Sequence, residues 1–580
     1  MDDAVVRPHR PPAAAAPPPQ LITTRGPAPQ ASKMGAHVRL AGPDYDEHVA
    51  LNPQEEEEPP LFYYKDDPNR DSRSVRGCFL DEIYAKPRLE QKLADLYFDG
   101  DVPFMRDNVH QLSDAQWRCF FEGYLVEPLP RKERKYAVVF YGVSGYTGSL
   151  VMEYLKRECL DDVNVCFAGR TLHKVIKMRD KVLSGTRWAN CDCVSCDLKE
   201  PFEVEALVSS CRVVCNIAGP FMLTGGERLV EACIHYDTDY CDVSGEIPWS
   251  AKLLEFHDVA RDAGVYIVPS TAYAGGLPDI MCYAMAKEAR EKYDEQLKEF
   301  HGYVSMYQER EGTVGASGGT LSTRAAMASG DAWVRKVMTD PFALGGSIQN
   351  GEREEDQDRV LTKVFRDSAI KSWVAPHVYA FFETRVVRRS NELHRTLVGG
   401  PDKGPFYGEN LNVTVYTLMP SEAAAKEFKK SGSTSTKAEE ERLKKEGKYY
   451  GPGEGPPLDD LFEIGVYSLY HGVGITESGK KVCWSIKGRD GYFETARMAV
   501  EAALAMSESG DELRSGSESV RGGVLTPGIA GKHVLFDRIR KAGMGFIDWS
   551  PGTAWDGVKP DDRLGVDVWG NKATPPPVAE

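Results

Sequence analysis

Short apolar runs alternate with amphipathic stretches through the middle of the chain. The first run, residues 136–141, stops at Gly142 and is typical of a strand that is buried on both faces of a parallel sheet. Further strands are predicted at residues 163–168, 190–198, 213–217, 239–243 and 265–269, with helices at 149–159, 226–235 and 247–263. Strands that alternate with helices indicate βαβ units, and six strands within about 135 residues suit a doubly wound nucleotide-binding domain.

After residue 271 the pattern becomes less regular. Helices are predicted at residues 280–293, 321–329 and 492–507, and strand-like runs occur at 300–308, 378–387 and 411–419. We therefore predict an α/β fold, with a Rossmann-type doubly wound parallel sheet over residues 134–272 and a second, α+β substrate or catalytic domain over residues 273–548. Residues 426–457 are rich in Lys and Glu and then in Gly and Pro, which predicts a solvated insertion within that domain.

Both ends of the chain have a different composition from its middle. The first 60 residues contain 12 of the 36 prolines and an acidic block, so they cannot bury enough apolar surface to offset the entropy of ordering. We predict a disordered Pro-rich tail at residues 1–60, an N-terminal extension at 61–133, and a C-terminal tail at 549–580 that is polar and ends in a run of prolines.

Charge and cysteine usage restrict the partners and the compartment. The 71 Lys and Arg residues against 87 Asp and Glu leave a formal net charge of −16, which argues against general nucleic-acid binding. Thirteen cysteines without paired spacing are typical of reduced thiols inside the cell. We expect a protein of the cytoplasm or of an intracellular membrane surface, not secreted and without a transmembrane segment. An oligomer stays open, and so does peripheral contact with a membrane or lipid droplet through residues 373–382.

The most informative motif is GVSGYTG at residues 142–148, between the first predicted strand and its helix. Glycines let a phosphate approach the backbone, and the start of a helix offers free N–H groups and a partial positive charge. The motif therefore predicts a dinucleotide site, with a purely structural turn as the alternative. The candidate residues are Gly142, Ser144, Gly145, Tyr146, Thr147 and Gly148.

The ends of later strands indicate which dinucleotide binds. An NAD site would place an acidic residue after the second strand, whereas this chain has Arg170 there and Lys174 shortly after, which favours the 2′-phosphate of NADP. Asp197, near the end of the third strand, is a candidate for the adenine or else a helix cap. At the end of the fourth strand we expect contacts on the nicotinamide side from Asn216, Gly219 and Pro220.

Three other clusters suggest different chemistry. Cys191, Cys193 and Cys196 have a ligand-like spacing, but they alternate within a predicted strand, so a zinc site is disfavoured. Ser317 lies in a G-x-S-x-G sequence, which would suit a hydrolase nucleophile, although no usual sheet precedes it. The arginines at 385, 388 and 389 could bind a carboxylate or phosphate, but we expect an ordinary solvated face.

Several separated motifs together resemble a known family. The segments at residues 142–148, 168–171, 216–221 and 238–246, and then 317–320, 384–390, 491–498 and 522–527, are similar to the saccharopine dehydrogenase-like oxidoreductases, in the branch of trans-acting enoyl reductases. The resemblance covers about residues 134–547 and rests on motifs in the right order. It implies a Rossmann domain, NADP as cofactor, and reduction of an enoyl substrate of lipid or polyketide type, with a role in lipid metabolism.

An enoyl reduction also needs a donor for the developing enolate and an acid for the α-carbon. Candidates for these catalytic roles are Tyr273, on the loop after the sixth predicted strand, and Glu246 and Asp242, after the fifth. Two alternatives stay open beside the enoyl reductase. One is a saccharopine dehydrogenase-like imine reductase, and the other is a non-catalytic NADP-binding protein at a membrane or lipid-droplet surface.

Overall fold

The fold is known from a computed structural model of the chain. It describes Ala94 and residues 98–109, 129–159, 161–310, 315–346, 358–399, 407–409, 411–432, 436–516 and 518–548. The chain divides into two units, residues 1–129 and 130–580. In the first unit, helix α4 (Val102–Asn108) begins after Asp101, whose carboxylate accepts a hydrogen bond from the Phe104 N–H at 2.9 Å. The predicted tails and most of the predicted extension lie outside the described residues.

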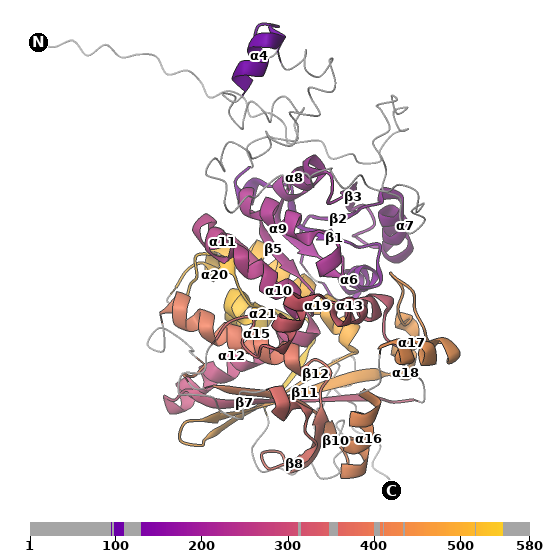
Figure 1. The fold of residues 1–580 in the computed structure, drawn as a ribbon, viewed down its shortest axis with the longest axis vertical. Coiled ribbons are helices and arrows are strands. Elements are labelled where there is room, and N and C mark those ends of the chain that lie inside the picture. The colour runs from indigo at the N-terminus through magenta and orange to yellow at the C-terminus, as the bar shows by residue number, and fades with distance from the viewer. Residues whose placement is uncertain are drawn as a thin grey trace, which may run out of the picture. The chain divides into compact units, whose positions relative to one another are not determined.

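The second unit contains two seven-stranded sheets in the described part of the chain (Figure 1). In the first, sheet A, all neighbouring strands run parallel. Its spatial order is β13 (Gly523–Val524), β6 (Tyr266–Val268), β5 (Asp239–Asp242), β4 (Cys211–Asn216), β1 (Tyr136–Tyr141), β2 (Val165–Gly169) and β3 (Asp192–Ser195). Every residue of β1 is buried, as its uninterrupted apolar run predicts. The order of β1 to β6 confirms the predicted Rossmann-type sheet.

Helices connect the strands of sheet A as predicted, with one difference. The connecting helices are α6 (Tyr146–Arg157), α7 (Leu172–Leu183), α8 (Pro201–Ser209), α9 (Gly226–His235), α10 (Ile247–Leu253) and α11 (His257–Ala263). The stretch predicted as one helix over residues 247–263 is divided, because a 3-10 turn, η4 (Leu254–Phe256), separates α10 from α11. Short 3-10 turns also occur at η2 (Arg131–Glu133) and η3 (Phe221–Leu223).

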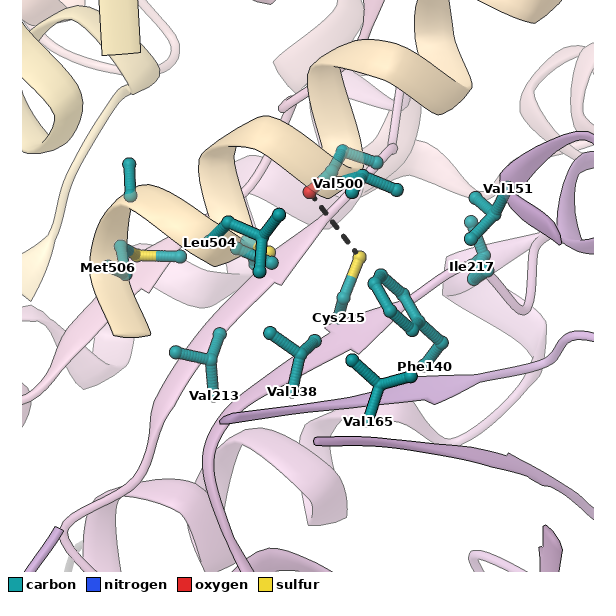
Figure 2. Packing of buried hydrophobic residues seen from close by; sticks show 14 of the residues in the cluster. Val138, Phe140, Val151, Val165, Val213, Cys215, Ile217, Val500, Leu504 and Met506 are labelled. Atoms are coloured by element: carbon teal, nitrogen blue, oxygen red, sulfur yellow. Dashed lines mark hydrogen bonds between the residues drawn. The ribbon is translucent and has the colours of Figure 1, made fainter. Parts of the chain in front are cut away.

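Helix α19 (Gly491–Glu508) completes the core of sheet A from far along the sequence. It contacts α6 and the strands β1, β4 and β5. Figure 2 shows Val500 and Leu504 of this helix beside Val213 and Cys215 of β4, and the Cys215 thiol lies 3.9 Å from the carbonyl oxygen of Ala499. Burying each large aliphatic side chain contributes roughly 1.5–3 kcal/mol. Residues of the predicted second domain therefore form part of the core of the first.

The second sheet, sheet B, is mixed. Its order is β14 (Gly545–Asp548), β12 (Lys481–Gly488), β11 (Val466–Thr476), β7 (Leu297–Gln308), β10 (Asn412–Met419), β9 (Ser372–Pro376) and β8 (Phe365–Asp367). Strands β7 and β10 run parallel, and the other neighbouring pairs are antiparallel. Helix α12 (Tyr273–Tyr293) packs on β7, β11 and β12, and it also contacts α19, so helices separate the two sheets (Figure 1).

One predicted strand is a helix. Residues 378–387, read as strand-like, contribute to helix α15 (Ala380–Leu393). Phe382 and Val386 lie four residues apart, as a buried helical face requires, but Glu383 and Arg385 are also buried. Because charged residues occupy the interior here, the polar face that reveals a helix is missing from the sequence pattern.

The remaining elements surround these layers. They are α13 (Gly318–Ala328), α14 (Ala332–Thr339), α16 (Glu422–Gly432), α17 (Thr436–Lys445), α18 (Leu458–Ile464), α20 (Gly510–Leu513), α21 (Pro527–Lys541), the 3-10 turn η6 (Asp358–Thr362) and the π-helical turn η7 (His394–Val398). Among the helices of the described residues, none has the length and apolar character that crossing a membrane requires.

Candidate functional site

The predicted cofactor residues follow strands whose carboxyl ends share one edge of sheet A, which is where open α/β sheets bind ligands. Loops from three strands meet there. The Gly142 N–H donates to the Ala168 carbonyl oxygen of β2 at 2.8 Å. Gly142 has a φ of +95°, and a Cβ atom on it would lie 2.7 Å from the backbone N of Ala218, in the loop after β4. A side chain at this position would therefore separate the loops.

The two following glycines of the motif serve different needs. A Cβ on Gly148 would lie 2.3 Å from Cα of Val143, so the helix can pack on its own loop only with glycine there. Gly145, in contrast, has an ordinary φ of −88°, and a Cβ on it would meet only the Gly142 carbonyl oxygen at 3.5 Å. The protein itself does not require a glycine at 145, whereas a closely bound phosphate would. The cradle at the start of α6 fits a dinucleotide pyrophosphate.

Two cations lie beyond the end of β2. Arg170 and Lys174 are both exposed, and within the described ranges neither side chain takes part in a hydrogen bond or ion pair. The Ser144 hydroxyl lies next to this strand end, 3.9 Å from the position of a Cβ on Gly169. An exposed arginine without an acidic partner, beside a phosphate-binding turn, fits the 2′-phosphate of NADP.

The next two candidates are engaged in local structure. The Asp197 carboxylate accepts a hydrogen bond from the Lys199 N–H at 3.1 Å, so it closes a turn before α8. Asn216 is fully buried at the end of β4, where its amide accepts from the Ala218 N–H at 3.0 Å and donates to the Tyr240 hydroxyl at 3.1 Å. Asn216 thus shapes the loop whose Gly219 is exposed and whose Pro220 is half-buried.

Glu246 braces the same loop from the other side. Its buried carboxylate accepts hydrogen bonds from the backbone N–H groups of Phe221 and Met222, at 2.9 and 3.0 Å. The Thr323 hydroxyl of α13 donates to it at 3.1 Å. Burial raises the pKa of Glu246, and these three hydrogen bonds oppose the rise. The carboxylate therefore ties the loop after β4 to α13.

Asp242 is the most heavily bonded carboxylate of the edge. It is fully buried, and it accepts hydrogen bonds from the Ser244 and Ser270 N–H groups at 2.9 and 3.1 Å. The Tyr240 hydroxyl and the Trp249 indole N–H donate to its other oxygen at 3.0 and 2.7 Å. Burial raises the pKa of Asp242, against the effect of the hydrogen bonds. Every donor belongs to the fold, so Asp242 joins the ends of β5 and β6 to α10.

Tyr273 has a different environment. Its side chain is half-buried, and its hydroxyl oxygen is shielded from solvent. Ser468 is the neighbouring polar side chain that opposes the effect of burial on its pKa, and the geometry gives the hydroxyl no closer hydrogen-bond partner among the described residues. Its ring lies edge-on to Tyr470, with 6.5 Å between ring centres, and the Tyr470 hydroxyl donates to Glu383 at 3.0 Å. Burial raises the pKa of Tyr273, which keeps the phenol protonated at neutral pH. Of the three catalytic candidates, Tyr273 alone has a free donor.

The first turn of α19 links Tyr273 to the glycine loop. A Cβ on Gly491 would lie 3.6 Å from the Tyr273 ring, and the Tyr273 N–H donates to the Thr495 hydroxyl at 3.2 Å. The neighbouring Tyr492 packs edge-on against Tyr146, the first residue of α6, at 5.3 Å between ring centres. Tyr273 and the phosphate-binding turn are therefore separated by the start of one helix.

Helix α13 lies over this region and contains residues that sequence reasoning did not assign to the site. The Tyr492 hydroxyl accepts a hydrogen bond from the Ser317 N–H at 2.8 Å and lies 3.2 Å from the Thr320 hydroxyl. The Ser317 hydroxyl caps the helix by accepting from the Thr320 N–H at 3.2 Å, a structural role. The motifs at 317–320 and 491–498 contained this signal, but nothing in them indicated that the two segments meet.

The end of the predicted insertion also reaches the glycine loop. The Tyr146 hydroxyl donates to the Pro456 carbonyl oxygen at 2.8 Å. A Cβ on Gly455 would lie 2.6 Å from the Tyr146 ring, and the Gly318 N–H donates to the Glu454 carbonyl oxygen at 3.0 Å. This part of residues 426–457 thus packs against the site, although the sequence predicted only a solvated segment.

The competing clusters take other places in the fold. Within the described residues, no group of His, Cys, Asp and Glu side chains could hold a metal ion, and Cys193 is buried in β3. Residues 373–382, considered for membrane contact, belong to β9, α15 and the turn between them, and Val378 is the most exposed of them at 58%. The expected solvated arginine face is wrong, because Arg385 is buried and paired with Asp358 at 2.7 Å.

Comparison with known proteins agrees with the motifs. Residues 138–268 match the saccharopine dehydrogenase NADP binding domain. Over 422 residues the chain is 27% identical to a trans-acting enoyl reductase of Mycobacterium tuberculosis (strain ATCC 25618 / H37Rv), covering 71% of this chain and 97% of that protein. A trans-acting enoyl reductase of Mycobacterium ulcerans (strain Agy99) is 26% identical over 434 residues, with the same coverage. Saccharopine dehydrogenase (L-Glu forming) from Saccharomyces cerevisiae aligns at a TM-score of 0.37 and 14% identity, covering 71% of this chain and 99% of that one. The resemblance inferred from the sequence motifs is confirmed.

Proposed function

Because the chain is an NAD(P)-dependent oxidoreductase of the saccharopine dehydrogenase-like type, we propose that it uses NADPH to reduce the C=C bond of an α,β-unsaturated acyl substrate of lipid or polyketide type. The names of the relatives support the reaction class. Exposed Arg170 supports NADPH over NADH, since it occupies the place where an NAD site would have an acid. The observation that carries the proposal is the free Tyr273 hydroxyl one helix turn from the phosphate-binding loop.

The cofactor, when bound, supplies a hydride to the β-carbon of the substrate. The chain's own residues hold and orient it. The backbone around Gly145 and the start of α6 bind the pyrophosphate, and Arg170 with Lys174 binds the 2′-phosphate. The loop at 218–221, braced by Asn216 and Glu246, borders the nicotinamide.

Tyr273 stabilises the charge that develops on the substrate. Its phenol donates a hydrogen bond to the acyl oxygen, where negative charge accumulates when the β-carbon accepts the hydride. Hydride transfer to the β-carbon would break the π bond of the C=C unit and leave its electron pair as an enolate, which would take a proton from solvent at the α-carbon, so that two C–H bonds form and NADPH is oxidised to NADP⁺. A phenol with a raised pKa is suited to donate without ionising first. Helix α13 is hydrogen-bonded to Glu246, and the segment ending at Pro456 is hydrogen-bonded to Tyr146, so both lie at this edge of the sheet.

The test uses the purified full chain, NADPH and crotonyl-CoA as a simple enoyl thioester. We expect NADPH-dependent formation of butyryl-CoA, detected by mass spectrometry, and a fall in kcat of about 100-fold or more in Tyr273→Phe, with little change in the Kd for NADPH. The matched control is Tyr293→Phe, at the other end of α12, where the ring packs against Lys480. That variant should keep full activity.

Two results would contradict the proposal. Absence of NADPH binding in a calorimetric titration would remove the cofactor assignment. Full activity in Tyr273→Phe would remove Tyr273 from the reaction and leave only the oxidoreductase class.

A further inference from the structure

A small cavity opens at the carboxyl ends of β6 and β13, between α10 and α15. It has room for a body of about the size of one water molecule. Its lining is mainly aliphatic. The polar residues that line it are Ser250, Ser270, Thr526 and Arg389, among the apolar residues Leu254, Pro269, Leu344, Val386, Val524 and Leu525. No acidic side chain lines it. The cavity adjoins the Asp242 network, because the Ser270 N–H donates to that carboxylate.

Arg389, which is half-buried, brings a positive charge to this cavity. One guanidinium nitrogen, Nη2, is 3.1 Å from Nδ1 of His257 and donates to the Val524 carbonyl oxygen at 3.3 Å. His257 Nδ1 lies 3.2 Å from the Val524 N and 3.3 Å from the Val524 carbonyl oxygen, and an imidazole offers no negative charge to Arg389 in either tautomer. The Nε of Arg389 is buried and makes no hydrogen bond to the described residues.

The charge of Arg389 has no carboxylate of its own. Burial lowers the pKa of Arg389 to about 10, which still leaves the guanidinium charged at neutral pH. The acid that acts on it electrostatically is Glu392, but both Glu392 oxygens accept from Arg395, at 2.6 and 2.7 Å. A partly buried charge without a counter-ion beside an apolar cavity is unfavourable, so the site favours an anion.

Ser250 provides an independent indication. Its side chain is 3% exposed and lines the cavity, and its hydroxyl makes no hydrogen bond to the described residues. Buried hydroxyls are satisfied in the great majority of proteins. A water molecule could satisfy the Ser250 hydroxyl and the Arg389 Nε, but as a neutral molecule it would leave the charge uncompensated.

We propose that this cavity binds a halide ion, held by the Nε–H of Arg389 and the hydroxyl of Ser250 among aliphatic side chains. The size of the cavity and its two free donors favour a monoatomic anion. A phosphate has four oxygens and two charges, and a carboxylate pairs its two oxygens with two parallel N–H groups on one edge of a guanidinium, whereas on the Nε edge of Arg389 Nη2 already contacts His257 and Val524. The site is separate from the proposed cofactor residues, so it does not depend on the proposed reaction.

Thermal unfolding of the full chain without NADPH tests the site. At constant ionic strength, chloride at a concentration well above its Kd should raise the Tm by about 3 °C relative to gluconate. Arg389→Met should abolish this shift, and Ser250→Ala should at least halve it. The matched control is Arg540→Met, because that side chain is 58% exposed and does not line the cavity. It should keep the shift.

A second measurement does not depend on the variants. Chlorine NMR linewidths of a chloride solution should broaden when the wild-type chain is added and narrow again with excess bromide. If Arg389→Met does not fold, the Tm shift of Ser250→Ala and the chlorine linewidths of wild type test whether the cavity binds chloride. Three results would each overturn the proposal. One is a chlorine linewidth that does not broaden, and another is a Tm that is equal in chloride and gluconate. The third result is an Arg389-dependent rise in Tm that is greater in acetate or phosphate than in chloride.

Discussion

The carboxyl edge of sheet A has two halves that differ in almost every respect. The loops after β1 and β2, the open half, offer a glycine cradle at Gly145 and exposed cations at Arg170 and Lys174. The loops after β5, β6 and β13, the closed half, contain the buried carboxylates of Asp242 and Glu246, and half-buried Arg389 of α15 donates to the Val524 carbonyl oxygen there. Both halves lie at the ends of parallel strands, so topology alone does not distinguish them.

The difference teaches how to separate a binding group from a structural one. In the open half, neither Gly145 nor Arg170 is required for the packing of the fold. In the closed half, Asp242 satisfies four donors that would otherwise be buried without a partner. Substitutions in the open half should therefore change the affinity for ligands, and those in the closed half should lower the free energy of unfolding.

The largest expected effect concerns Gly145 and Gly148. Gly145→Ala should weaken NADPH binding by about 100-fold, or about 2.7 kcal/mol, because the methyl group enters the space of the pyrophosphate. The free energy of unfolding of this variant should fall by only about 1 kcal/mol, because alanine is a poor helix N-cap. Gly148→Ala should lower stability more than binding, since its Cβ meets the Val143 backbone. Calorimetry and denaturant unfolding of both variants measure this contrast, and equal behaviour of the two glycines would contradict it.

Asp242→Asn addresses the closed half. The amide introduces a donor where four donors already converge, and the free energy of unfolding should fall by about 2 kcal/mol. The Kd for NADPH should change by less than about threefold, because the fold keeps its open half. Asp258→Asn, at a carboxylate that is 77% exposed, is the control and should stay within about 0.5 kcal/mol of wild type. Loss of NADPH binding without loss of stability would assign Asp242 to the ligand instead.

Arg170→Asp tests the open half by charge. The substitution should reduce the preference for NADPH over NADH by about tenfold or more, because it replaces attraction to the 2′-phosphate by repulsion. Stability should hardly change. Lys177→Asp, an exposed cation on α7, controls for the altered net charge. An unchanged ratio of the two Kd values would exclude Arg170 from cofactor selection.

A further prediction concerns the pH dependence of stability, through the buried Glu383 behind Tyr273. Burial raises the pKa of Glu383 from its usual 4.5 to about 8, so the folded state holds this proton more tightly than the unfolded state. The contribution to stability is therefore complete below pH 4.5 and is lost as the pH rises to 8. Between pH 5 and 8, we expect the free energy of unfolding of wild type to fall by about 3 kcal/mol more than that of Glu383→Gln in denaturant unfolding. Parallel pH profiles would show that Glu383 is ionised throughout.

Much of the first sheet could be predicted from the sequence, because strands such as β1 and β2 are short apolar runs that stop at a glycine. Strand β13 could not, since Gly523 and Val524 form only two residues and take their place through pairing with β6. Helix α15 was mistaken for a strand because buried Glu383 and Arg385 hide its periodicity. The local sequence pattern does not predict an element when the residues that pair with it or bury it lie far away in the sequence.

The candidate site shows the same limit. Asp242, Glu246 and Tyr273 were all identified as catalytic candidates by their positions after strands. Their spacing in the sequence did not show which of them has a catalytic role. What separates them is the number of donors that reach each side chain, from Trp249, Phe221 and other residues on different elements. The cover formed by α13 and the segment ending at Pro456 was missed for a similar reason, since only folding brings these segments to Tyr146 and Tyr492.

The late position of α19 and β13 in the chain has a consequence for biosynthesis. Strands β1 to β6 leave the ribosome first, but the face that Val500 and Leu504 cover stays uncovered until residues 491–524 have been translated. The nascent dinucleotide-binding half therefore displays an apolar surface during the synthesis of more than two hundred further residues. We expect this interval to be the time at which chaperones bind the chain.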